Sequence, residues 1–257
     1  MKGLEGRRIL VAGGATGIGR AIAIRLAEEG SHVVVGDFNQ PGVEQTVQDI
    51  QAKMSAVKIK AVFFDYSKPD TIRNLVKEAV DFLGGLDGLV NVGVLGGKAL
   101  TMDVDIPDLD PESWQYIING DLIGYAVAVQ AALPYLKQSG KGSIVNTTSG
   151  SIFGGMPFMP AYQAAKAGVL ALTKYVAQFH AAEGLRSNCV SPGPILSDAV
   201  KEKTPQSHID GVVPTVPLRR WGQPDEIASL YAYLLSDDAS YINGQTWSCC
   251  GGKYLRD

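Results

Sequence analysis

The sequence predicts an α/β fold in which a doubly wound parallel sheet of about seven strands forms a single domain. Short β-branched runs alternate with longer amphipathic segments along the whole chain. Two of the short runs, 32–36 and 88–92, are apolar nearly throughout, which is typical of parallel strands buried under helices on both faces. The chain has 257 residues, about the length at which such a fold remains one domain. We therefore expect residues 1–257 to form one domain.

The individual elements follow from their periodicity. Seven short apolar runs predict strands at 9–12, 32–36, 59–64, 88–92, 143–147, 187–190 and, as a last short strand, 245–248. Between them the helical period predicts helices at 17–29, 42–53, 70–83, 111–137 and 161–182. Two long connections remain, 94–110 and 192–220. Both should emerge at the carboxyl ends of strands, where open parallel sheets bind ligands.

Composition excludes several kinds of partner. The 23 Lys and Arg against 26 Asp and Glu leave a net charge of −3 with no basic block, so we expect no nucleic acid and no membrane surface as partner. No apolar run approaches the roughly 20 residues of a membrane span, and the run after the basic N-terminus is too short for a signal peptide. Cys189, Cys249 and Cys250 form no disulfide framework and show no metal-type spacing to histidine. We expect a cytoplasmic protein with reduced thiols and no metal.

A glycine-rich turn marks the first candidate site. The first predicted strand runs into a turn that opens the next helix and contains Gly13, Thr16, Gly17, Ile18 and Gly19. Backbone N–H groups and the positive helix end would face this turn. The pattern predicts a pyrophosphate site, because glycines allow the tight turn and the close approach of a diphosphate. The alternative is a turn with a purely structural role.

Asp37, at the end of the second predicted strand, indicates which dinucleotide is bound. It lies 18 residues beyond Gly19, where an acidic side chain accepts hydrogen bonds from a ribose diol. The same carboxylate would repel a 2′-phosphate, and no Arg or Lys lies in the turn or directly after Asp37. This favours NAD over NADP as the cofactor. The alternative is that Asp37 only caps the following helix.

Tyr162 and Lys166 form the second candidate site. They are four residues apart on a predicted helix, so they share a face. They follow the strand at 143–147 and the hydroxyl-rich turn that ends in Ser149, at the same sheet edge as the glycine turn. A phenol with an ordinary pKa of about 10 ionises more readily beside an ammonium group. This position therefore predicts proton-transfer chemistry, although the spacing alone is common by chance.

Together these motifs resemble the short-chain dehydrogenase/reductase family, essentially from end to end. The matching residues are Gly13, Gly17, Ile18, Gly19, Asp65, Asn91, Ser149, Tyr162, Lys166, 192–195 with Ser197, 130–134, 220–228 and 243–245. The resemblance implies a Rossmann fold, a dinucleotide cofactor and a substrate loop at about 192–220.

The resemblance also implies roles for the cofactor-binding residues. Asp65 would meet the adenine, and Ile195 would bond the nicotinamide amide through its backbone, with Ser197 in place of the usual threonine. Further cofactor contacts are implied at Thr16, Asn91, Tyr162, Lys166, Pro192 and Gly193.

The implied catalytic residues are Ser149, Tyr162, Lys166 and Asp121. Ser149 would hold the substrate oxygen, Tyr162 would transfer its proton, and Lys166 would bind the nicotinamide ribose and lower the pKa of Tyr162. Asp121 stands where the family has a catalytic Asn. We hypothesise that its carboxylate lies within several ångströms of Lys166 and partly cancels the positive field of that lysine. The alternative is that the side chain points elsewhere and only the backbone carbonyl takes part.

The substrate pocket should be mostly apolar. Its expected lining is Val94, Ser151, Ile152, Met156, Phe158 and Leu196. For Met156 and Phe158, core filling is an equal alternative. Val94 departs from the family pattern, which has a glycine there, and Cys250 stands where an aspartate often precedes two glycines.

These observations predict an NAD-dependent oxidoreductase that interconverts a secondary alcohol and a ketone on a small to mid-sized, largely apolar or cyclic small-molecule substrate. One alternative is reduction of a carrier-linked 3-oxoacyl chain, which would prefer NADP and a basic docking patch. Another is a dinucleotide-binding sensor with decayed chemistry, and a methyltransferase is a third. Charged residues make up only 19% of the chain, against an average of roughly 25%. With the resemblance, this predicts a homotetramer in which helices 111–137 and 161–182 pair across one two-fold interface.

Overall fold

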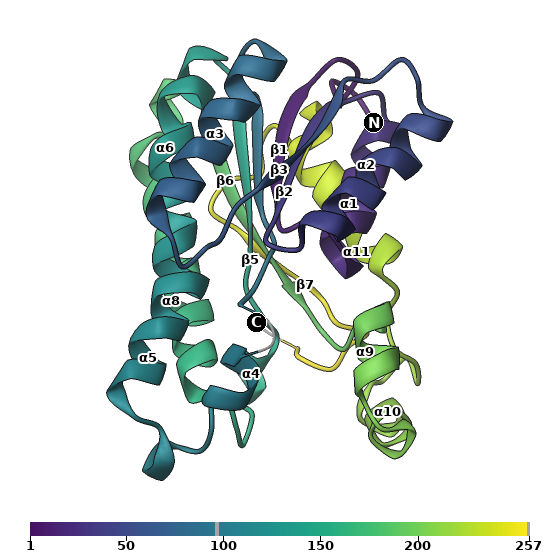
Figure 1. Ribbon diagram of the computed structural model, residues 1–257, viewed down its shortest axis with the longest axis vertical. Coiled ribbons are helices and arrows are strands. Elements are labelled where there is room, and N and C mark those ends of the chain that lie inside the picture. The colour runs from purple at the N-terminus through teal and green to yellow at the C-terminus, as the bar shows by residue number, and fades with distance from the viewer. Residues whose placement is uncertain (96–97, 256–257) are drawn as a thin grey trace.

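Seven strands form one parallel sheet in the computed structural model, which describes residues 1–95 and 98–255. The strand order is β3-β2-β1-β4-β5-β6-β7 (Figure 1). The strands are β1 (Arg8–Ala12), β2 (His32–Asp37), β3 (Ile59–Phe63), β4 (Gly88–Asn91), β5 (Gly142–Thr147), β6 (Leu185–Pro192) and β7 (Thr246–Cys249). The predicted fold class is confirmed. The order reverses between β1 and β4, which is where such sheets open a crevice for ligands.

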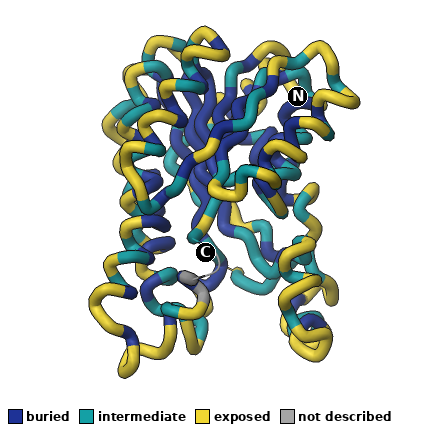
Figure 2. The backbone as a smooth tube through the Cα atoms, viewed as in Figure 1, coloured by how far each residue is buried: buried dark blue, intermediate teal, exposed yellow. Residues whose placement is uncertain are grey.

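Helices cover both faces of the sheet (Figure 1). One layer consists of α1 (Gly17–Glu28), α2 (Gln40–Lys53) and α11 (Pro224–Leu235), and the other of α3 (Pro69–Leu83), α6 (Gly124–Gln138) and α8 (Pro160–Phe179). Because successive residues of a strand point to opposite faces, Ile9 and Val11 pack with the first layer, and Leu10 and Ala12 with the second. The strands are therefore buried on both sides, as Figure 2 shows.

Two features of the helices were not predicted. The segment expected as one helix at 111–137 is α5 (Pro111–Ile118), a π-helical turn over Asn119–Ile123 and then α6. Such turns are frequent at functional sites, and this one contains Asp121. Helix α11 was missed although its start carries a sequence signal: Pro224 at the first turn and a capping box between Gln223 and Glu226.

The two long connections contain short helices and lie at the carboxyl edge of the sheet (Figure 1). The first holds α4 (Lys98–Met102) and η1 (Ile106–Asp108), and its residues 96–97 lie outside the described residues. The second holds α9 (Asp198–Lys203), α10 (Gln206–Val212) and η4 (Val213–Thr215). In Figure 1, α4 and α5 lie on one side of this edge, and α9 and α10 on the other.

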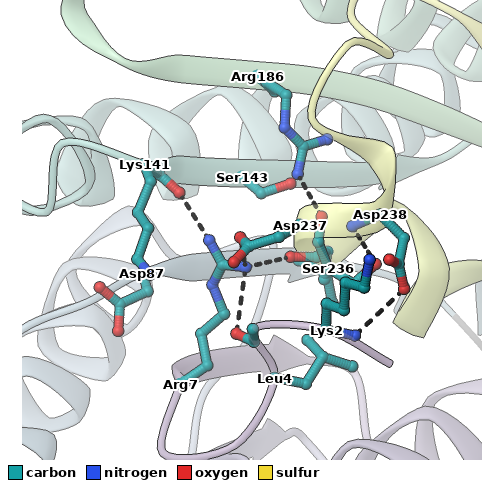
Figure 3. Close-up of polar contacts among 12 residues, drawn as sticks. Lys2, Leu4, Arg7, Asp87, Lys141, Ser143, Arg186, Ser236, Asp237 and Asp238 are labelled. Atoms are coloured by element: carbon teal, nitrogen blue, oxygen red, sulfur yellow. Dashed lines mark hydrogen bonds and ion pairs between the residues drawn. The ribbon is translucent and has the colours of Figure 1, made fainter.

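At the opposite, amino edge of the sheet, two arginines bind the end of α11 (Figure 3). Arg7 donates to the carbonyl of Leu235 at 2.8 Å and to that of Lys141 at 3.0 Å. Arg186 donates to the carbonyls of Leu234 at 2.9 Å and Ser236 at 3.1 Å. The last carbonyls of a helix have no partner within the helix, so these arginines supply the missing donors.

Among the described helices, the path over Pro111–Gln138 is long and apolar enough to cross a membrane by length and composition alone. Of its most apolar 18-residue stretch, 44% is buried inside the protein, and it packs against α3 and α8. A core helix passes the same test, so the expectation that the protein has no membrane partner stays a prediction.

Candidate active site

The turn between β1 and α1 is built so that only glycine fits at its closest approaches. Gly13 has a φ of +104°, and a Cβ there would lie 2.2 Å from the backbone nitrogen of Gly93. A Cβ on Gly19 would lie 1.8 Å from the carbonyl oxygen of Gly13. The turn therefore packs directly on the end of β4 and leaves the N-terminus of α1 open to a ligand, which suits an anionic group.

Asp37 faces this turn from the end of β2. Its Oδ2 accepts a hydrogen bond from the backbone N–H of Ala15 at 2.9 Å, and its Oδ1 accepts one from that of Asn39 at 2.9 Å. Burial raises the pKa of Asp37, and these hydrogen bonds oppose the rise. The side chain that caps α2 is Asn39, which accepts from Gly42. The alternative that Asp37 serves as the cap of that helix is therefore wrong.

A cleft of about 1520 Å³ runs along the carboxyl edge past both features. Of the residues expected to bind cofactor or substrate, it is lined by Gly13, Thr16, Gly17, Asp37, Asp65, Val94 and Leu196. Its volume exceeds the usual 300–1,000 Å³ of small-molecule sites, so there is room for a dinucleotide together with a substrate.

Other residues expected to bind the cofactor make structural contacts around this cleft. The Asn91 side chain donates to Oδ1 of Asn146 at 2.9 Å inside the sheet. Ser197 caps α9 and lies opposite Gly17, where a Cβ would be 3.3 Å from the Ser197 Cβ. The strand end at Pro192, Gly193 and Ile195 is tied to Gly150, Cys249 and Gly222 by backbone contacts. Their roles toward the cofactor stay predictions.

Ser149 and Tyr162 meet at the end of β5. A hydrogen bond joins the Tyr162 phenol to the Ser149 hydroxyl, and Ser149 also accepts from the Ser151 hydroxyl at 2.9 Å. Burial raises the pKa of Tyr162 to about 12, the bond to Ser149 opposes this, and the charge of Asp121 adds to it. Without further help the phenol therefore stays protonated at neutral pH.

Lys166 lies one turn further along α8 and is fully buried. Its ammonium donates to the hydroxyl of Tyr125 at 3.3 Å and lies 4.4 Å from the centre of that ring and 5.7 Å from the centre of the Tyr162 ring. Burial lowers the pKa of Lys166, whereas the charge of Asp121 raises it. The structure thus brings Ser149, Tyr162 and Lys166 together as expected.

Asp121 is buried in the π-helical turn, and its Oδ1 accepts from the backbone N–H of Leu95 at 2.9 Å. Burial raises the pKa of Asp121, and the charge of Lys166 opposes that rise. The carboxylate bonds to the loop after β4, and its charge acts on Lys166 and Tyr162. Its expected closeness to Lys166 and the alternative role of its backbone carbonyl stay predictions.

Asp103 is a functional candidate that the sequence reasoning missed. It is buried and accepts hydrogen bonds from the first N–H groups of α8, Ala161 at 3.1 Å and Tyr162 at 2.8 Å. The residue before the helix, Met159, has a left-handed φ of +60° and gives no side-chain cap. A carboxylate from a different segment therefore holds the end of the helix that carries Tyr162. No local pattern signals such a cap.

The expected substrate lining is spread over three segments, which follow β4, β5 and β6. Val94 and Leu196 line the cleft. Ser151 and Ile152 lie in α7 (Ser151–Gly154), directly after Ser149. The backbone N–H of Met156 donates a hydrogen bond to the Gln163 side chain. Phe158 is 48% exposed, so it does not fill the core. Among residues 1–95 and 98–255, no group of three or more His, Cys, Asp or Glu side chains could hold a metal ion.

Comparisons with known proteins show what the whole chain is similar to. A family model described as enoyl-(acyl carrier protein) reductase matches residues 13–253. The chain is similar to the 3-oxoacyl-[acyl-carrier-protein] reductase FabG of Thermotoga maritima, with 32% identity over 252 residues that cover 98% of this chain and 99% of the relative. It is 35% identical over 257 residues to a probable 2,4-dienoyl-CoA reductase of Bacillus subtilis, covering 98% of each chain.

Solved structures show the same architecture. Levodione reductase superposes with a TM-score of 0.90 at 28% identity, covering 97% of this chain and 98% of that one. L-Sorbose reductase from Gluconobacter frateurii superposes with a TM-score of 0.90 at 23% identity, covering 98% of each chain, and supports the fold alone. From its full-length sequence matches and its Rossmann sheet, the chain belongs to the short-chain dehydrogenase/reductase family of oxidoreductases.

Proposed function

We propose that this protein is an NAD(H)-dependent oxidoreductase that interconverts a secondary alcohol and a ketone in a small to mid-sized, largely apolar or cyclic substrate. One observation carries the proposal. A hydroxyl, a phenol and a buried ammonium, from Ser149, Tyr162 and Lys166, lie together at the sheet edge that also holds the glycine turn and Asp37. This arrangement provides a proton donor beside a dinucleotide site.

The residues around the cleft fit a dinucleotide. The turn at 13–19 would receive the pyrophosphate, Asp37 the adenosine ribose, and the segment from Pro192 the nicotinamide end. The bound cofactor supplies the hydride chemistry, and the protein contributes position and electrostatics. Ser149 would hold the substrate oxygen by its hydroxyl. Tyr162 would give a proton to that oxygen in reduction and take it in oxidation.

Lys166 makes this proton transfer possible near neutral pH. Burial holds the pKa of Tyr162 near 12, and the ammonium of Lys166 favours the tyrosinate by its positive charge. An ammonium has three N–H donors, and within the described residues one of them is used, by Tyr125. The others are directed to a ribose hydroxyl in the proposed complex.

The choice of NAD rests on the charge around Asp37. Phe38 and Asn39, which follow it, carry no positive charge to balance a 2′-phosphate. Arg20 lines the same cleft but is paired with Asp49 at 2.6 Å. We expect kcat/KM for NAD⁺ to exceed that for NADP⁺ at least roughly tenfold, and Asp37→Ser to narrow the gap. Asp70→Asn, which removes an exposed charge on α3, serves as control. Equal use of both cofactors by the unchanged protein would overturn the assignment.

The substrate class is tested with a panel of cyclic, aromatic and aliphatic secondary alcohols with NAD⁺, followed by NADH absorbance. We expect cyclic and apolar alcohols to be oxidised fastest, because Val94 and Leu196 line the cleft beside the proposed nicotinamide end. Tight NADH binding without turnover of any alcohol or ketone would instead favour the dinucleotide-binding sensor.

A second candidate function is reduction of a carrier-linked 3-oxoacyl thioester, which the names of the FabG relatives favour. A carrier protein is acidic and would need free basic groups at the cleft mouth. In the described loop at 192–220, Lys201 is paired with Asp198 and Arg220 with Glu226, but within the described residues Lys203, which lines the cleft, has no ion pair. Reduction of a 3-oxobutanoyl thioester with NADPH at a higher kcat/KM than any ketone with NADH would favour this second function.

We further propose that the protein is a cytoplasmic homotetramer. Tyr175 and Phe179 on α8 are 58% and 61% exposed, and their rings contact each other, tilted, at 4.9 Å between ring centres. An exposed aromatic pair on a long helix supports burial in an interface between copies. Sedimentation at micromolar concentration is the test, and a monomer there would contradict the proposal.

A further inference from the structure

Two tyrosine rings, tilted by 39° to each other, pack together between the glycine turn and Lys166. Tyr66 and Tyr125 are both buried, and their ring centres lie 5.1 Å apart. Each hydroxyl donates to a backbone carbonyl at the end of a strand. Tyr66 bonds to Ala12 at 3.0 Å, and Tyr125 bonds to Gly93 at 2.8 Å. Tyr66 therefore ties the end of β1 to the loop after β3, and Tyr125 ties the segment just after β4 to helix α6.

Only one member of this pair contacts the ammonium of Lys166. The hydroxyl oxygen of Tyr125 accepts from Lys166 at 3.3 Å, and the ring of Tyr125 has the ammonium 4.4 Å from its centre. Both contacts stabilise a cation, since the ring face is electron-rich and the oxygen has free lone pairs. A fully buried ammonium without such partners would be costly.

Asp121 does not replace Tyr125 in this role. Its Oδ1 is bonded to the N–H of Leu95 at 2.9 Å, so the carboxylate serves the loop after β4. It acts on Lys166 through its charge and at a distance. The direct contact that fixes the position of the ammonium therefore comes from α6, four residues beyond Asp121.

We propose that Tyr125 is the positioning residue of Lys166: its ring and its hydroxyl hold the ammonium in the place where it acts on Tyr162, and its bond to Gly93 ties that place to the cofactor turn. This inference rests on the proposed roles of Tyr162 and Lys166. Tyr125 packs against Lys166 from the interior of the protein and contacts neither substrate nor cofactor in the proposed complex.

The charged and titratable groups around Lys166 come from four elements. They are Asp121 in the π-helical turn, Tyr125 in α6, Tyr162 in α8 and Cys189 in β6. Tyr125→Phe leaves three of them unchanged and removes one acceptor of the ammonium. The pKa of Lys166 should fall further and its position should loosen, so that the tyrosinate of Tyr162 is less favoured. The rising limb of the pH profile for alcohol oxidation should then move upward.

The experiment compares Tyr125→Phe with the matched control Tyr66→Phe, which removes a buried hydroxyl of the neighbouring ring without touching Lys166. The readouts are the pH profile of kcat/KM for the alcohol oxidised fastest in the panel, and the near-ultraviolet tyrosinate absorbance of the protein with NAD⁺, taken as the difference from Tyr162→Phe in the same background. In Tyr125→Phe we expect the limb to move upward by about half to one pH unit, with about a three- to tenfold loss of kcat/KM below it. In Tyr66→Phe the limb should stay in place.

Coincident limbs for Tyr125→Phe and the unchanged protein would overturn the proposal, as would an equal shift in Tyr66→Phe, which would indicate general loosening. Because Tyr125→Phe could fail to fold, a second measurement uses the unchanged protein. The δ and ε methylene protons of Lys166, assigned by their loss in Lys166→Met, should be shifted upfield in the NMR spectrum by the Tyr125 ring. Unshifted protons would exclude the contact. If Tyr162→Phe keeps its activity, the proposed function fails instead.

Discussion

The two edges of the sheet both bury positive charge, but they treat it differently. At the amino edge, Arg7 and Arg186 are bonded to carbonyls at the end of α11, and Arg7 also pairs with Asp237 at 3.1 Å (Figure 3). Burial and the charge of Arg7 lower the pKa of Arg186 to about 10, which leaves it charged at neutral pH. At the carboxyl edge, Lys166 has one neutral hydroxyl and an aromatic ring.

We expect this difference to separate a structural cation from one that takes part in the proposed chemistry. Carbonyls at a helix end need donors, so the arginines satisfy the backbone and have a fixed task. Within the described residues the lysine uses one donor, and it lies in the field of Asp121, so we expect its charge to act on Tyr162 and on a bound ligand. Substitutions at the amino edge should change the free energy of unfolding more than kcat, whereas those at the carboxyl edge should change kcat more than the free energy of unfolding.

The largest effect is expected for Tyr162→Phe. Removing only the phenolic hydroxyl should lower kcat about 10²–10⁴-fold, as is usual for a general acid or base, while the affinity for NADH stays nearly the same. Tyr231→Phe is the control, since it removes another buried hydroxyl at this edge, bonded to Thr147 at 2.6 Å. Near-normal turnover in Tyr162→Phe would mean that the chemistry lies elsewhere.

Arg7→Met tests the other edge. Loss of the guanidinium leaves carbonyls of Leu235 and Lys141 without a donor, and the free energy of unfolding should fall by about 2–4 kcal/mol. Chemical denaturation measures this, and kcat per folded molecule should not change. Lys141→Met makes the same change of charge on an exposed neighbouring side chain and should cost far less. A drop in kcat as large as that of Tyr162→Phe would erase the distinction between the edges.

Asp121→Asn tests how the charge of Asp121 acts on Tyr162 at the carboxyl edge. The charge of Asp121 raises the pKa of Tyr162, so its removal should lower that pKa and move the rising limb of kcat/KM for oxidation downward. At about 6 Å and an effective dielectric of about 20, two unit charges interact by about 2.8 kcal/mol, or about two pH units as an upper limit. We expect about one unit, with little change in KM for NAD⁺. A limb that stays or moves upward would eliminate the electrostatic role.

The smallest effect is expected for Asp103→Ala. Loss of the cap on α8 should cost about 1 kcal/mol of stability and lower kcat only a few-fold, because Tyr162 stays in place but its helix end is looser. Asp103→Asn should restore most of the stability, since its amide oxygen can still accept one bond. Asp105→Ala removes the aspartate that caps η1 in the same connection and should leave kcat unchanged. Equal kcat losses in both alanine variants would point to the loop rather than to the cap.

Local patterns were sufficient for the strands and for the motifs that belong to one segment. The glycine turn, Asp37 and the pair Tyr162 and Lys166 are each written within one strand, turn or helix, so periodicity and spacing predicted them. Helix α11 could also have been predicted from the sequence, because its capping box and Pro224 are local signals. The π-helical turn could not be predicted in this way, since one inserted residue leaves the period of the helix almost unchanged.

The sequence by itself determined the doubly wound sheet and marked, by short motifs, the residues at its carboxyl edge where we expect the chemistry. Only the tertiary structure decided which side chains contact these residues and the segments around them. Tyr125 contacts Lys166, Asp103 binds the start of α8, and Asp121 binds the loop after β4. The physical reason is range. A motif is fixed by the few residues that share a turn of backbone, whereas burial and charge act between side chains from different elements, whose meeting depends on how the whole sheet and its helices pack.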